Sequence, residues 1–510
     1  MSSASCPPGT LIPQVLLETP LVRGREALPM QRQLHQQLKQ AILCGRLAPG
    51  SRLPGSRTLA EALAISRNTA TAAYDLLAAE GYLQPDRQGT RVAALASTGP
   101  AASIAARGPS RSAAPSRAAP SRAAPPPPVA RRLALIQPSG AGSDAATPLR
   151  PGVPALPHFP LAEWRRALER AVNRAGTAAL GYGDPLGEPA LRAAIARHLS
   201  VARGVRCTPM QVIVTEGAQE ALALSARLLT NPGDTVWIED PGYRGAKAAM
   251  QAADLQLVAM RVDADGLRVT ARDWTQRRPR LVYTTPSHQY PSGAVLSATR
   301  RLALIADARQ HGAWLIEDDY DSEFRHAGES IGAMQGLVAQ APVLYIGTFS
   351  KTMFPALRLG FLVLPEDLLV ALQTPLQELL RGGHRHEQLA LCDFIDSGAF
   401  VRHLGRMRRL YRERQRALRD SLTRHLHVPH VIEGGHSGMH LSLRLPPEFA
   451  DHRIVDAARQ HGMAPTALSS FALRPRPEDN GLVLGYGNTA AERFEPLIKR
   501  LAQLVRAAAR

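Results

Sequence analysis

Residues 347–360 read GTFSKTMFPALRLG and continue the apolar run Val343–Gly347. They contain Lys351, one of only four lysines in a chain that otherwise uses arginine as its cation. A lysine amine withdrawn from water has a lowered pKa and can form a Schiff base with an aldehyde, which a guanidinium cannot do. This segment predicts a covalent site for a phosphorylated aldehyde; a surface lysine beside an anion site is the alternative. The hydroxyl and fork-shaped donors that would suit the phosphate are Thr348, Ser350 and Arg358.

Short apolar runs alternate with helical stretches from about residue 150 to the end of the chain. Such alternation is typical of a mainly parallel sheet that helices cover on both faces. Ligands of these sheets bind at the carboxyl ends of the strands. We therefore expect an α/β fold whose site lies where the strands end. The candidate strands are Val212–Thr215, Val236–Glu239, Leu257–Met260, Leu281–Thr284, Trp314–Glu317, Val343–Gly347 and Leu359–Leu364.

Polar turns follow three of these strands. Residues 216–219 (EGAQ) lead into a helix, whose free backbone N–H groups would bind an anion. Residues 240–243 (DPGY) present an aromatic side chain. Residues 318–321 (DDYD) present carboxylates, which suit helix caps or a metal site, although the metal alternative lacks histidine partners close by. An aldehyde, a phosphate and a ring that needs a carboxylate partner together indicate pyridoxal 5′-phosphate (PLP).

The N-terminal part has a different pattern. Leucine or isoleucine recurs every four residues at Leu34, Leu38 and Ile42, which predicts one helix. Residues 53–83 (LPGSRTLAEALAISRNTATAAYDLLAAEGYL) predict two helices joined by a tight turn, a helix-turn-helix with serine caps at Ser56 and Ser66. The segment YLQPDRQGTRV then predicts two short strands, or a wing. A purely structural three-helix bundle is the alternative.

Residues 96–150 are rich in proline, alanine, serine and arginine, with a recurring Ser-Arg-Ala-Ala-Pro unit. Proline fixes φ and removes hydrogen-bond donors, and the small residues offer no apolar face, so we expect a semi-extended basic linker. The linker is either a spacer or a segment that touches DNA phosphates. The formal net charge of +18 favours nucleic acid as a partner; an arginine-rich genome is the alternative explanation.

The four cysteines are widely scattered, which excludes a disulfide scaffold or zinc ribbon and fits a reducing compartment. No apolar run reaches the length of a membrane span, and the N-terminus MSSASCPPGT has no features of a signal peptide. We expect a soluble cytoplasmic protein without a metal site. The cysteines are Cys6, Cys44, Cys207 and Cys392.

Residues 150–510 resemble the fold-type I aminotransferase domain of MocR-type regulators, the GntR subfamily that includes PdxR-like proteins. The resemblance rests on YGDPLGEPALRAAIARHL, TEGAQEAL, EDPGYRG, TPSHQYPSG, IEDDYDSEFR, GTFSKTMFPALRLG and LGYG, in the family's order and spacing. It implies a PLP-dependent aminotransferase-like fold with large and small subdomains, and a site at a homodimer interface.

The resemblance also implies a role for each site residue. Lys351 would carry PLP as a Schiff base, Asp318 would hold the pyridine nitrogen, and Tyr320 would bond the 3-oxygen. Tyr243 would stack on the ring, and Tyr182 would reach the phosphate from the neighbouring subunit. The remaining phosphate contacts would be Ala218, Gln219, Thr348, Ser350 and Arg358.

Two positions depart from working aminotransferases. Tyr290 stands where those enzymes usually have an asparagine, a replacement that is typical of MocR-type regulators. Asn480 and Gly481 precede Leu482–Leu484, where those enzymes place an arginine for the substrate carboxylate. We interpret His436 and His440 as core or rim residues. The arginines that could replace the missing one are Arg244, Arg444, Arg474 and Arg476, although a surface role suits each.

Residues 28–93 resemble the winged helix-turn-helix of GntR-family regulators. The implied DNA contacts are Arg57, Arg67 and Gly89, with Ser66, Asn68 and Thr71 nearby; a basic residue is common in the family where Thr71 stands. The predicted domains are an N-terminal tail (1–27), the winged helix-turn-helix (28–95), the linker (96–150) and the aminotransferase-like domain (151–510, with a small subdomain from about 380).

These features together predict a transcription regulator that binds double-stranded operator DNA and senses PLP or a small amine or amino acid. An active PLP-dependent aminotransferase with an appended DNA-binding domain is the alternative. A third possibility is a protein that stores the cofactor and has no specific operator.

Overall fold

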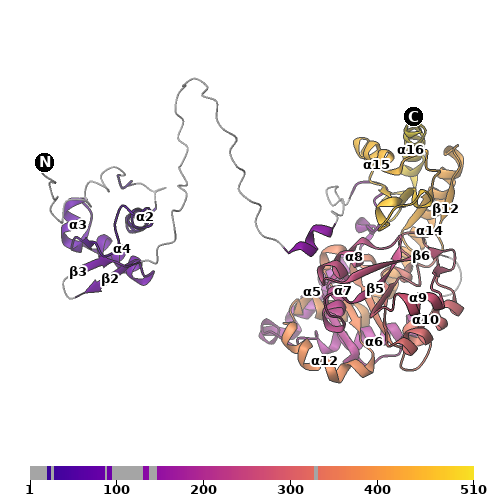
Figure 1. Cartoon of the computed structure of the whole chain (residues 1–510), viewed down its shortest axis with the longest axis horizontal. Coiled ribbons are helices and arrows are strands. Elements are labelled where there is room, and N and C mark those ends of the chain that lie inside the picture. The colour runs from indigo at the N-terminus through magenta and orange to yellow at the C-terminus, as the bar shows by residue number, and fades with distance from the viewer. Residues whose placement is uncertain are drawn as a thin grey trace. The chain divides into compact units, whose positions relative to one another are not determined.

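The computed structural model describes residues 20–23, 28–86, 89–94, 130–136, 146–326 and 331–509. The chain divides into two compact units, Met1–Ala124 and Pro125–Arg510, both drawn in Figure 1. Most of the predicted tail (1–27) and of the predicted linker (96–150) lies outside the described residues, so these domain boundaries stay predictions. No described helix combines the length and apolar character needed to cross a membrane.

The described residues of the N-terminal unit form three helices and a small antiparallel sheet with strand order β1-β3-β2. Its core is formed by apolar side chains that all three helices direct inward, among them Leu34, Leu59 and Leu77. The predicted helix-turn-helix and wing are thereby confirmed. The elements are α2 (Met30–Leu43), β1 (Arg52–Leu53), α3 (Ser56–Ala62), α4 (Arg67–Ala79), β2 (Leu83–Asp86) and β3 (Gly89–Val92).

The two predicted serine caps differ in outcome. Ser66 caps α4, since its side chain accepts a hydrogen bond from the Thr69 backbone N–H at 3.1 Å. The Ser56 cap is wrong, because α3 begins one residue earlier than expected and Gly55 occupies the cap position with extended backbone. Between the two helices, Ala64 has a positive φ of 51°, which turns the chain within a few residues.

The larger unit is built on a sheet whose described strands have the order β4-β11-β10-β9-β8-β5-β6-β7. Strands β10, β9, β8, β5 and β6 pair in parallel, whereas β11 and β7 are antiparallel to their neighbours. Each of the seven predicted strands is confirmed in this sheet. The bounds are β4 (Val212–Thr215), β5 (Thr235–Asp240), β6 (Gln256–Asp263), β7 (Gly266–Leu267), β8 (Leu281–Thr284), β9 (Trp314–Asp319), β10 (Val343–Thr348) and β11 (Gly360–Val363).

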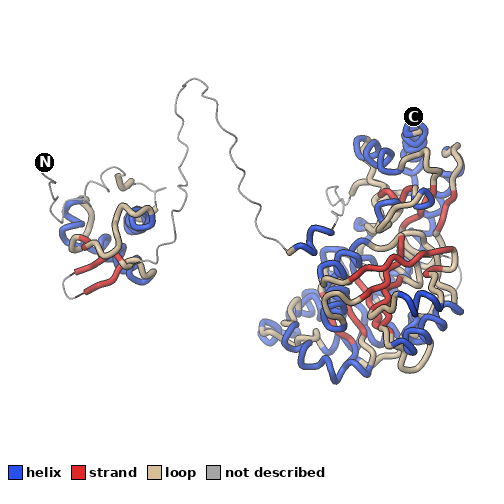
Figure 2. Tube along the Cα trace, in the orientation of Figure 1, coloured by secondary structure: helices blue, strands red, loops and turns tan. Residues whose placement is uncertain are grey.

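Helices cover both faces of this sheet (Figures 1 and 2). Successive strand residues point to opposite faces, so that Ile316 packs under α7, α8 and α12, whereas Leu315 packs toward α9 and α10. Buried residues of α5, α6 and α13 extend the second layer. The helices are α5 (Leu161–Ala175), α6 (Pro189–Arg203), α7 (Ala218–Leu229), α8 (Arg244–Ala252), α9 (Ala271–Gln276), α10 (Ala298–His311), α12 (Glu366–Leu379) and α13 (Arg385–Asp396).

The C-terminal part adds a second, antiparallel sheet with the order β12-β13-β15-β14. Buried residues of the long helix α14 pack with those of α16 and β15, including Leu418, Ile498 and Leu484. The elements are α14 (Ala399–His425), β12 (Val431–Glu433), β13 (His440–Arg444), α15 (Asp451–Gln460), β14 (Thr466–Ala467), β15 (Gly481–Gly485) and α16 (Phe494–Ala508).

Two adjacent leucines of α4 test the packing of the N-terminal unit. Leu77 is fully buried, whereas Leu76 is 41% exposed. We expect Leu77→Ala to destabilise this unit by about 2–5 kcal/mol, because it leaves a cavity, and Leu76→Ala to change it by less than about 1 kcal/mol. Hydrogen exchange of the α2–α4 amides in the full chain measures both effects. Equal loss of protection in the two variants would contradict the packing.

Candidate functional site

A cavity of about 320 Å³ lies at the carboxyl ends of the parallel strands of the larger unit. A larger hollow of about 720 Å³ lies at the opposite ends of the strands, beside Trp314 and Arg309, and does not include Lys351. The smaller cavity is therefore the candidate site. Its lining residues are Pro151, Gly152, Ala218, Gln219, Tyr243, Tyr283, Thr285, Tyr290, Asp318, Tyr320, Asp321, Thr348, Ser350, Lys351, Pro355, Arg358, Met439 and His440.

Lys351 lies in the short helix α11 (Phe349–Thr352), directly after β10. Its Nζ donates a hydrogen bond to the Gly152 carbonyl oxygen at 2.7 Å. Burial lowers the pKa of the Lys351 amine, and the nearby carboxylates of Asp321 and Asp318 oppose part of this shift. A lowered pKa increases the fraction of neutral amine, the form that attacks an aldehyde.

Asp318 lies near the end of β9 and lines the same cavity. Its Oδ2 accepts a hydrogen bond from the Tyr283 hydroxyl at 2.8 Å, whereas its Oδ1 is buried without a partner among the described residues. Burial raises the pKa of the Asp318 carboxyl to about 7. An unpartnered buried carboxylate oxygen is costly. A cationic N–H, such as that of a protonated pyridine ring, would satisfy it and lower this pKa.

Hydrogen-bond donors gather where α7 and α11 begin. Helix α7 starts at Ala218, and the first two residues of this helix line the cavity, so its positive end borders the site. Arg358 adopts a left-handed conformation with φ 52° and donates to the Glu216 carbonyl oxygen at 2.8 Å. A side chain at Gly360 would place its Cβ 2.7 Å from the Gly217 Cα, so glycine is needed for this close approach. These donors suit a phosphate dianion.

Tyrosine rings form a further wall of the cavity. The Tyr290 ring stands edge-on to the rings of Tyr243 and Tyr320, with centroid distances of 6.0 and 5.8 Å. The Tyr320 hydroxyl donates to the His288 carbonyl oxygen at 2.9 Å. Burial raises the pKa of Tyr243 to about 12 and also raises the pKa of Tyr290, so both remain neutral phenols at physiological pH.

Nine residues with predicted cofactor roles come together in this one cavity. Tyr182 does not, because it lies in the loop before α6 and is 87% exposed. Its predicted place is across a dimer interface, which a single chain does not test. The nine residues are Lys351, Asp318, Tyr320, Tyr243, Ala218, Gln219, Thr348, Ser350 and Arg358.

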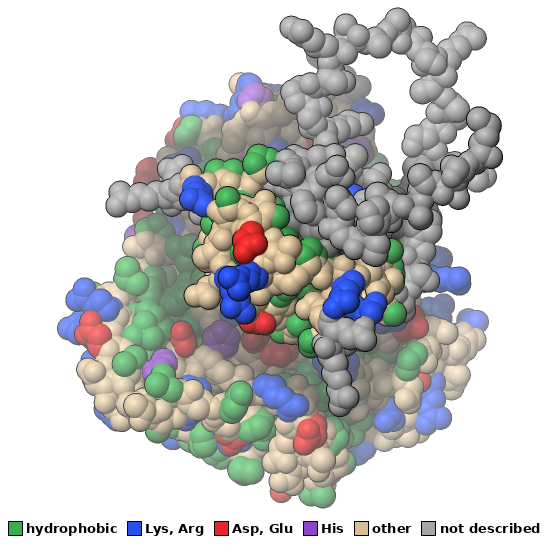
Figure 3. Space-filling model, turned by 90° about the vertical axis from the view of Figure 1, so that its left-hand side faces the viewer, with side chains coloured by type: hydrophobic (Ala, Val, Ile, Leu, Met, Phe, Trp, Pro, Cys, Tyr) green, Lys and Arg blue, Asp and Glu red, His purple; other side chains and the backbone are tan. Residues whose placement is uncertain are grey.

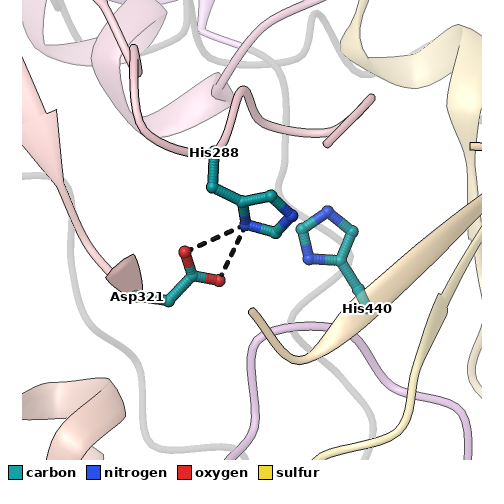
Figure 4. Close-up of side chains that lie close together, drawn as sticks. All are labelled: His288, Asp321 and His440. Atoms are coloured by element: carbon teal, nitrogen blue, oxygen red, sulfur yellow. Dashed lines mark hydrogen bonds and ion pairs between the residues drawn. The ribbon is translucent and has the colours of Figure 1, made fainter. Parts of the chain in front are cut away.

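Two lining residues, Asp321 and His440, belong to a buried group that the sequence did not reveal (Figure 4). His288 Nδ1 lies 2.9 and 3.1 Å from the two carboxylate oxygens of Asp321, and His440 lies beside the same imidazole. The expectation that residues 318–321 lack histidine partners is therefore wrong, since these histidines arrive from distant segments. The three side chains offer metal-type ligands, but a metal ion would have to displace the bond between Asp321 and His288.

Several lining residues were missed because their signals depend on the fold. Tyr283 lies within an apolar run whose pattern predicts only a buried strand, yet its hydroxyl donates a hydrogen bond to Asp318. Gly152 contributes only its carbonyl oxygen to Lys351. His440 was interpreted as a core or rim residue, and it is both buried and part of the wall. Burial lowers the pKa of His440 to about 3, so its imidazole is neutral.

The four arginines left open from the sequence do not line this cavity. Arg244 places its guanidinium over the Phe471 ring, 5.0 Å from the centroid. Arg444 forms an ion pair with Glu433 at 2.7 Å. Arg474 and Arg476 are exposed.

In the N-terminal unit, the first turn of α4 presents its polar side chains to solvent. Arg67, Asn68 and Thr71 are exposed, and Arg57 is exposed on α3 with an ion-pair distance of 3.6 Å to Glu61. Figure 3 shows Lys and Arg side chains on the visible face, interspersed with Asp, Glu and uncharged side chains. A helix start of this composition suits contact with base edges and phosphates in a major groove.

Arg52 is a further exposed arginine beside the wing, and the sequence did not indicate it as a DNA contact. Gly89 has a φ of 138°, and a Cβ placed there would lie 3.1 Å from Arg52 Nε. Arg52 is exposed on β1 and pairs in register with Arg91 of β3. Only the pairing of strands far apart in sequence brings Arg52 to the wing.

The two units and their sites define a class of protein: a winged-helix DNA-binding module joined to an aminotransferase-like domain. The family described as "Bacterial regulatory proteins, gntR family" matches residues 30–92, and "Aminotransferase class I and II" matches residues 148–481. The "Probable rhizopine catabolism regulatory protein MocR" of Rhizobium meliloti is 40% identical over 471 residues, covering 91% of this chain and 92% of its own. The chain belongs to the MocR-type transcription regulators of the GntR family.

Other relatives agree. The "HTH-type pyridoxine biosynthesis transcriptional regulator PdxR" of Corynebacterium glutamicum is 31% identical, covering 93% of this chain and 96% of its own. Among solved structures, the α-aminoadipate aminotransferase LysN of Thermus thermophilus is 26% identical with a TM-score of 0.66, covering 74% of this chain and 97% of its own. That aminotransferase structure is a complex with N-(5′-phosphopyridoxyl)-L-leucine. These matches confirm the expected aminotransferase-like fold and the family that the motifs indicated.

The raised pKa of Asp318 predicts a pH dependence of stability. Its ordinary pKa is 3.8 and its value in the folded chain is about 7, so between these values unfolding releases a proton and becomes easier as pH rises. Without cofactor, we expect the melting temperature to fall as the pH rises from about 4 to about 7, and to fall less in Asp318→Asn. Thermal unfolding monitored by tryptophan fluorescence measures the difference. Identical pH slopes in both proteins would contradict the buried, unpartnered state.

Proposed function

We propose that this regulator binds PLP through Lys351 and that the state of this site changes its affinity for operator DNA. The observation that carries the proposal is the buried, unpartnered Asp318 Oδ1 in the same cavity as the Lys351 amine. When bound, PLP supplies an aldehyde that condenses with an amine and a ring that withdraws electrons. The chemistry of the donor set fits this group at the amine, at the ring nitrogen and at the phosphate.

Each residue has a distinct task in this proposal. Lys351 holds the aldehyde carbon, and Asp318 holds the ring nitrogen in its protonated form. Tyr243 covers one face of the ring, and Tyr320 bonds the 3-oxygen. The phosphate is held by the start of α7 together with side chains of the turns after β10 and β11: Ala218, Gln219, Thr348, Ser350 and Arg358.

Contacts within the larger unit support a coupling between this site and the linker. The described end of the linker, a single turn at Arg131–Leu135, packs on α8, where Arg132 Nε donates to the Ala252 carbonyl oxygen at 2.9 Å. Helix α8 begins directly after Tyr243, which lines the cavity. The chain then continues to Gly152, which accepts the Lys351 hydrogen bond. One end of this segment thus contacts the helix that follows Tyr243, and the other end contacts Lys351.

The DNA contacts follow from the exposed start of α4 and from the wing. Arg67 and Asn68 would meet base edges, and Arg57 would meet phosphates, with the wing placed at its Gly89 turn. The domain that does this is residues 28–95, tethered by residues 96–150 to the sensor at 151–510. The full set of contact residues is Arg57, Ser66, Arg67, Asn68, Thr71 and Gly89.

A homodimer completes the proposal. Several large apolar side chains are exposed around α5 and the segment that follows it, and patches of this kind mark protein interfaces. In the dimer, Tyr182 would reach the partner's phosphate site. The exposed side chains are Leu161, Val172, Leu180 and Tyr182.

An active aminotransferase is the second candidate, because the cavity keeps both Lys351 and Asp318. The curated relatives named above are regulators, and the arginines considered as carboxylate ligands lie outside the cavity lining. Multiple-turnover conversion of common amino acids by the holoprotein would favour the enzyme; a single turnover or none would favour the sensor.

Lys351→Ala tests the sensor. We expect this variant to lose the visible absorbance of the Schiff base and the effect of PLP on operator affinity, an effect of about 5- to 150-fold in the wild type. Absorbance spectra and gel shifts with and without PLP measure both. Lys499→Ala, which removes an exposed lysine of α16, is the control for loss of a lysine elsewhere. A PLP response that survives in Lys351→Ala would contradict the assignment.

Arg67→Ala tests the DNA-binding helix. The loss of one base contact should weaken operator binding by about 1–3 kcal/mol. Arg46, which is exposed in the loop after α2, is the matched control for charge alone. Gel shifts at constant salt measure both variants. Equal weakening by Arg46→Ala and Arg67→Ala would contradict a specific contact.

A further inference from the structure

The charges of the cavity wall define the chemical class of the effector. We propose that the site selects a primary amine that carries no carboxylate group. This inference rests on the proposed function and narrows it, since an amino acid and a simple amine could both react with the bound aldehyde.

The described lining of the cavity contains few charged groups. Its cations are Lys351 and Arg358, and its anions are Asp318 and Asp321. Once PLP is bound, Arg358 faces the phosphate, Lys351 is joined to the aldehyde carbon, and Asp318 faces the ring nitrogen. Arg358 offsets only part of the charge of the phosphate dianion, and Asp321 also remains, so a carboxylate-bearing effector would enter a negative site.

Apart from these charged groups, the described wall of the cavity is neutral. His440 has a pKa of about 3 and is neutral, and Tyr290 is a neutral phenol because burial raises its pKa. His288 Nδ1 is occupied by its hydrogen bond to Asp321, and His288 is not among the residues that line the cavity. Neutral hydroxyl and imidazole groups can bond a hydroxyl or ether, but they do not replace a guanidinium as a carboxylate partner.

An apolar cluster packs against Tyr290. Leu468, Phe471 and Val483 are buried together, and Tyr290 packs against them with its ring edge-on to Phe471 at 5.2 Å. Val483 lies in β15, the strand before which aminotransferases place their carboxylate-binding arginine. An apolar cluster therefore occupies the region where that guanidinium would be expected.

Two arginines lie near the cavity without lining it. Arg244 faces the Phe471 ring. Arg150 adds to the lowering of the Lys351 pKa by its charge, but only the following residues, Pro151 and Gly152, reach the wall. Both are included in the test below as alternative carboxylate partners.

The proposed reaction is an exchange of amines at one carbon atom. The effector nitrogen forms a C–N double bond to the aldehyde carbon as the bond to Lys351 Nζ breaks. The two protons of the attacking amine end on Lys351, which leaves as a free amine. No oxidant or reductant is needed, and the exposed Lys351 amine is the measurable product.

The experiment compares matched pairs in which a hydroxymethyl group replaces the carboxylate: ethanolamine against glycine, and 3-amino-1-propanol against 3-aminopropanoate. The holoprotein is incubated with each compound and reduced with borohydride, and mass spectrometry measures the fraction of Lys351 that keeps the cofactor. For each pair, we compare the concentrations that free half of Lys351 from the cofactor. We expect the concentration of the amino alcohol to be at least about tenfold lower than that of the acid, because one uncompensated charge contact gives about this factor.

Two variants examine the cause. Asp321→Asn should narrow the preference for the amino alcohol, because it removes the negative charge that remains in the wall. Asp265→Asn removes an exposed carboxylate elsewhere and should leave the preference unchanged. If the acids release Lys351 at concentrations equal to or lower than those of the amino alcohols, the inference is overturned. In that case, the arginine whose replacement by alanine (Arg150→Ala or Arg244→Ala) weakens release by the acids would be the partner of the carboxylate. If Lys351 never carries the cofactor, the proposed function itself fails.

Discussion

The structure depends on the parallel register of three neighbouring strands. Pairing places Tyr283 of β8 beside Ile316 of β9, and Asp318 of β9 beside Ile346 of β10. Because parallel strands end at the same edge, their last residues and the turn into α11 meet in one cavity. The sheet thus holds a carboxylate and an amine within a single small volume, and every proposed step at the site requires this proximity.

Burial gives these groups their chemical properties. On one face of β9, Asp319 is paired with Arg203 at 2.8 Å and with the Tyr345 hydroxyl at 2.6 Å, so its charge is satisfied. On the other face, Asp318 keeps one oxygen without a partner. The alternation of strand residues therefore separates a structural ion pair from a carboxylate that is available to a ligand. This division explains how one short run of acids can serve both stability and binding.

Much of the fold could be predicted because local sequence patterns indicate where its helices and strands lie. The apolar runs marked all seven predicted strands, and Ser66 marked the start of α4. The rest depends on pairing between distant segments. His288 and His440 meet Asp321 only in the folded chain, and Arg52 reaches the wing only through its pairing with β3. The Ser56 cap was wrong because Gly55 can adopt the cap conformation itself. The roles of the site residues came from the family resemblance, and the cavity explains why those residue types belong together.

The central claim is that one particular amine carries the cofactor. The chain has only four lysines, which makes the assignment unambiguous. The protein is incubated with PLP, reduced with borohydride and digested, and the peptides are analysed by mass spectrometry. The account predicts a phosphopyridoxyl group on Lys351 in every labelled molecule, with Lys39, Lys247 and Lys499 unmodified. Label on those lysines, or an unmodified Lys351, would contradict it.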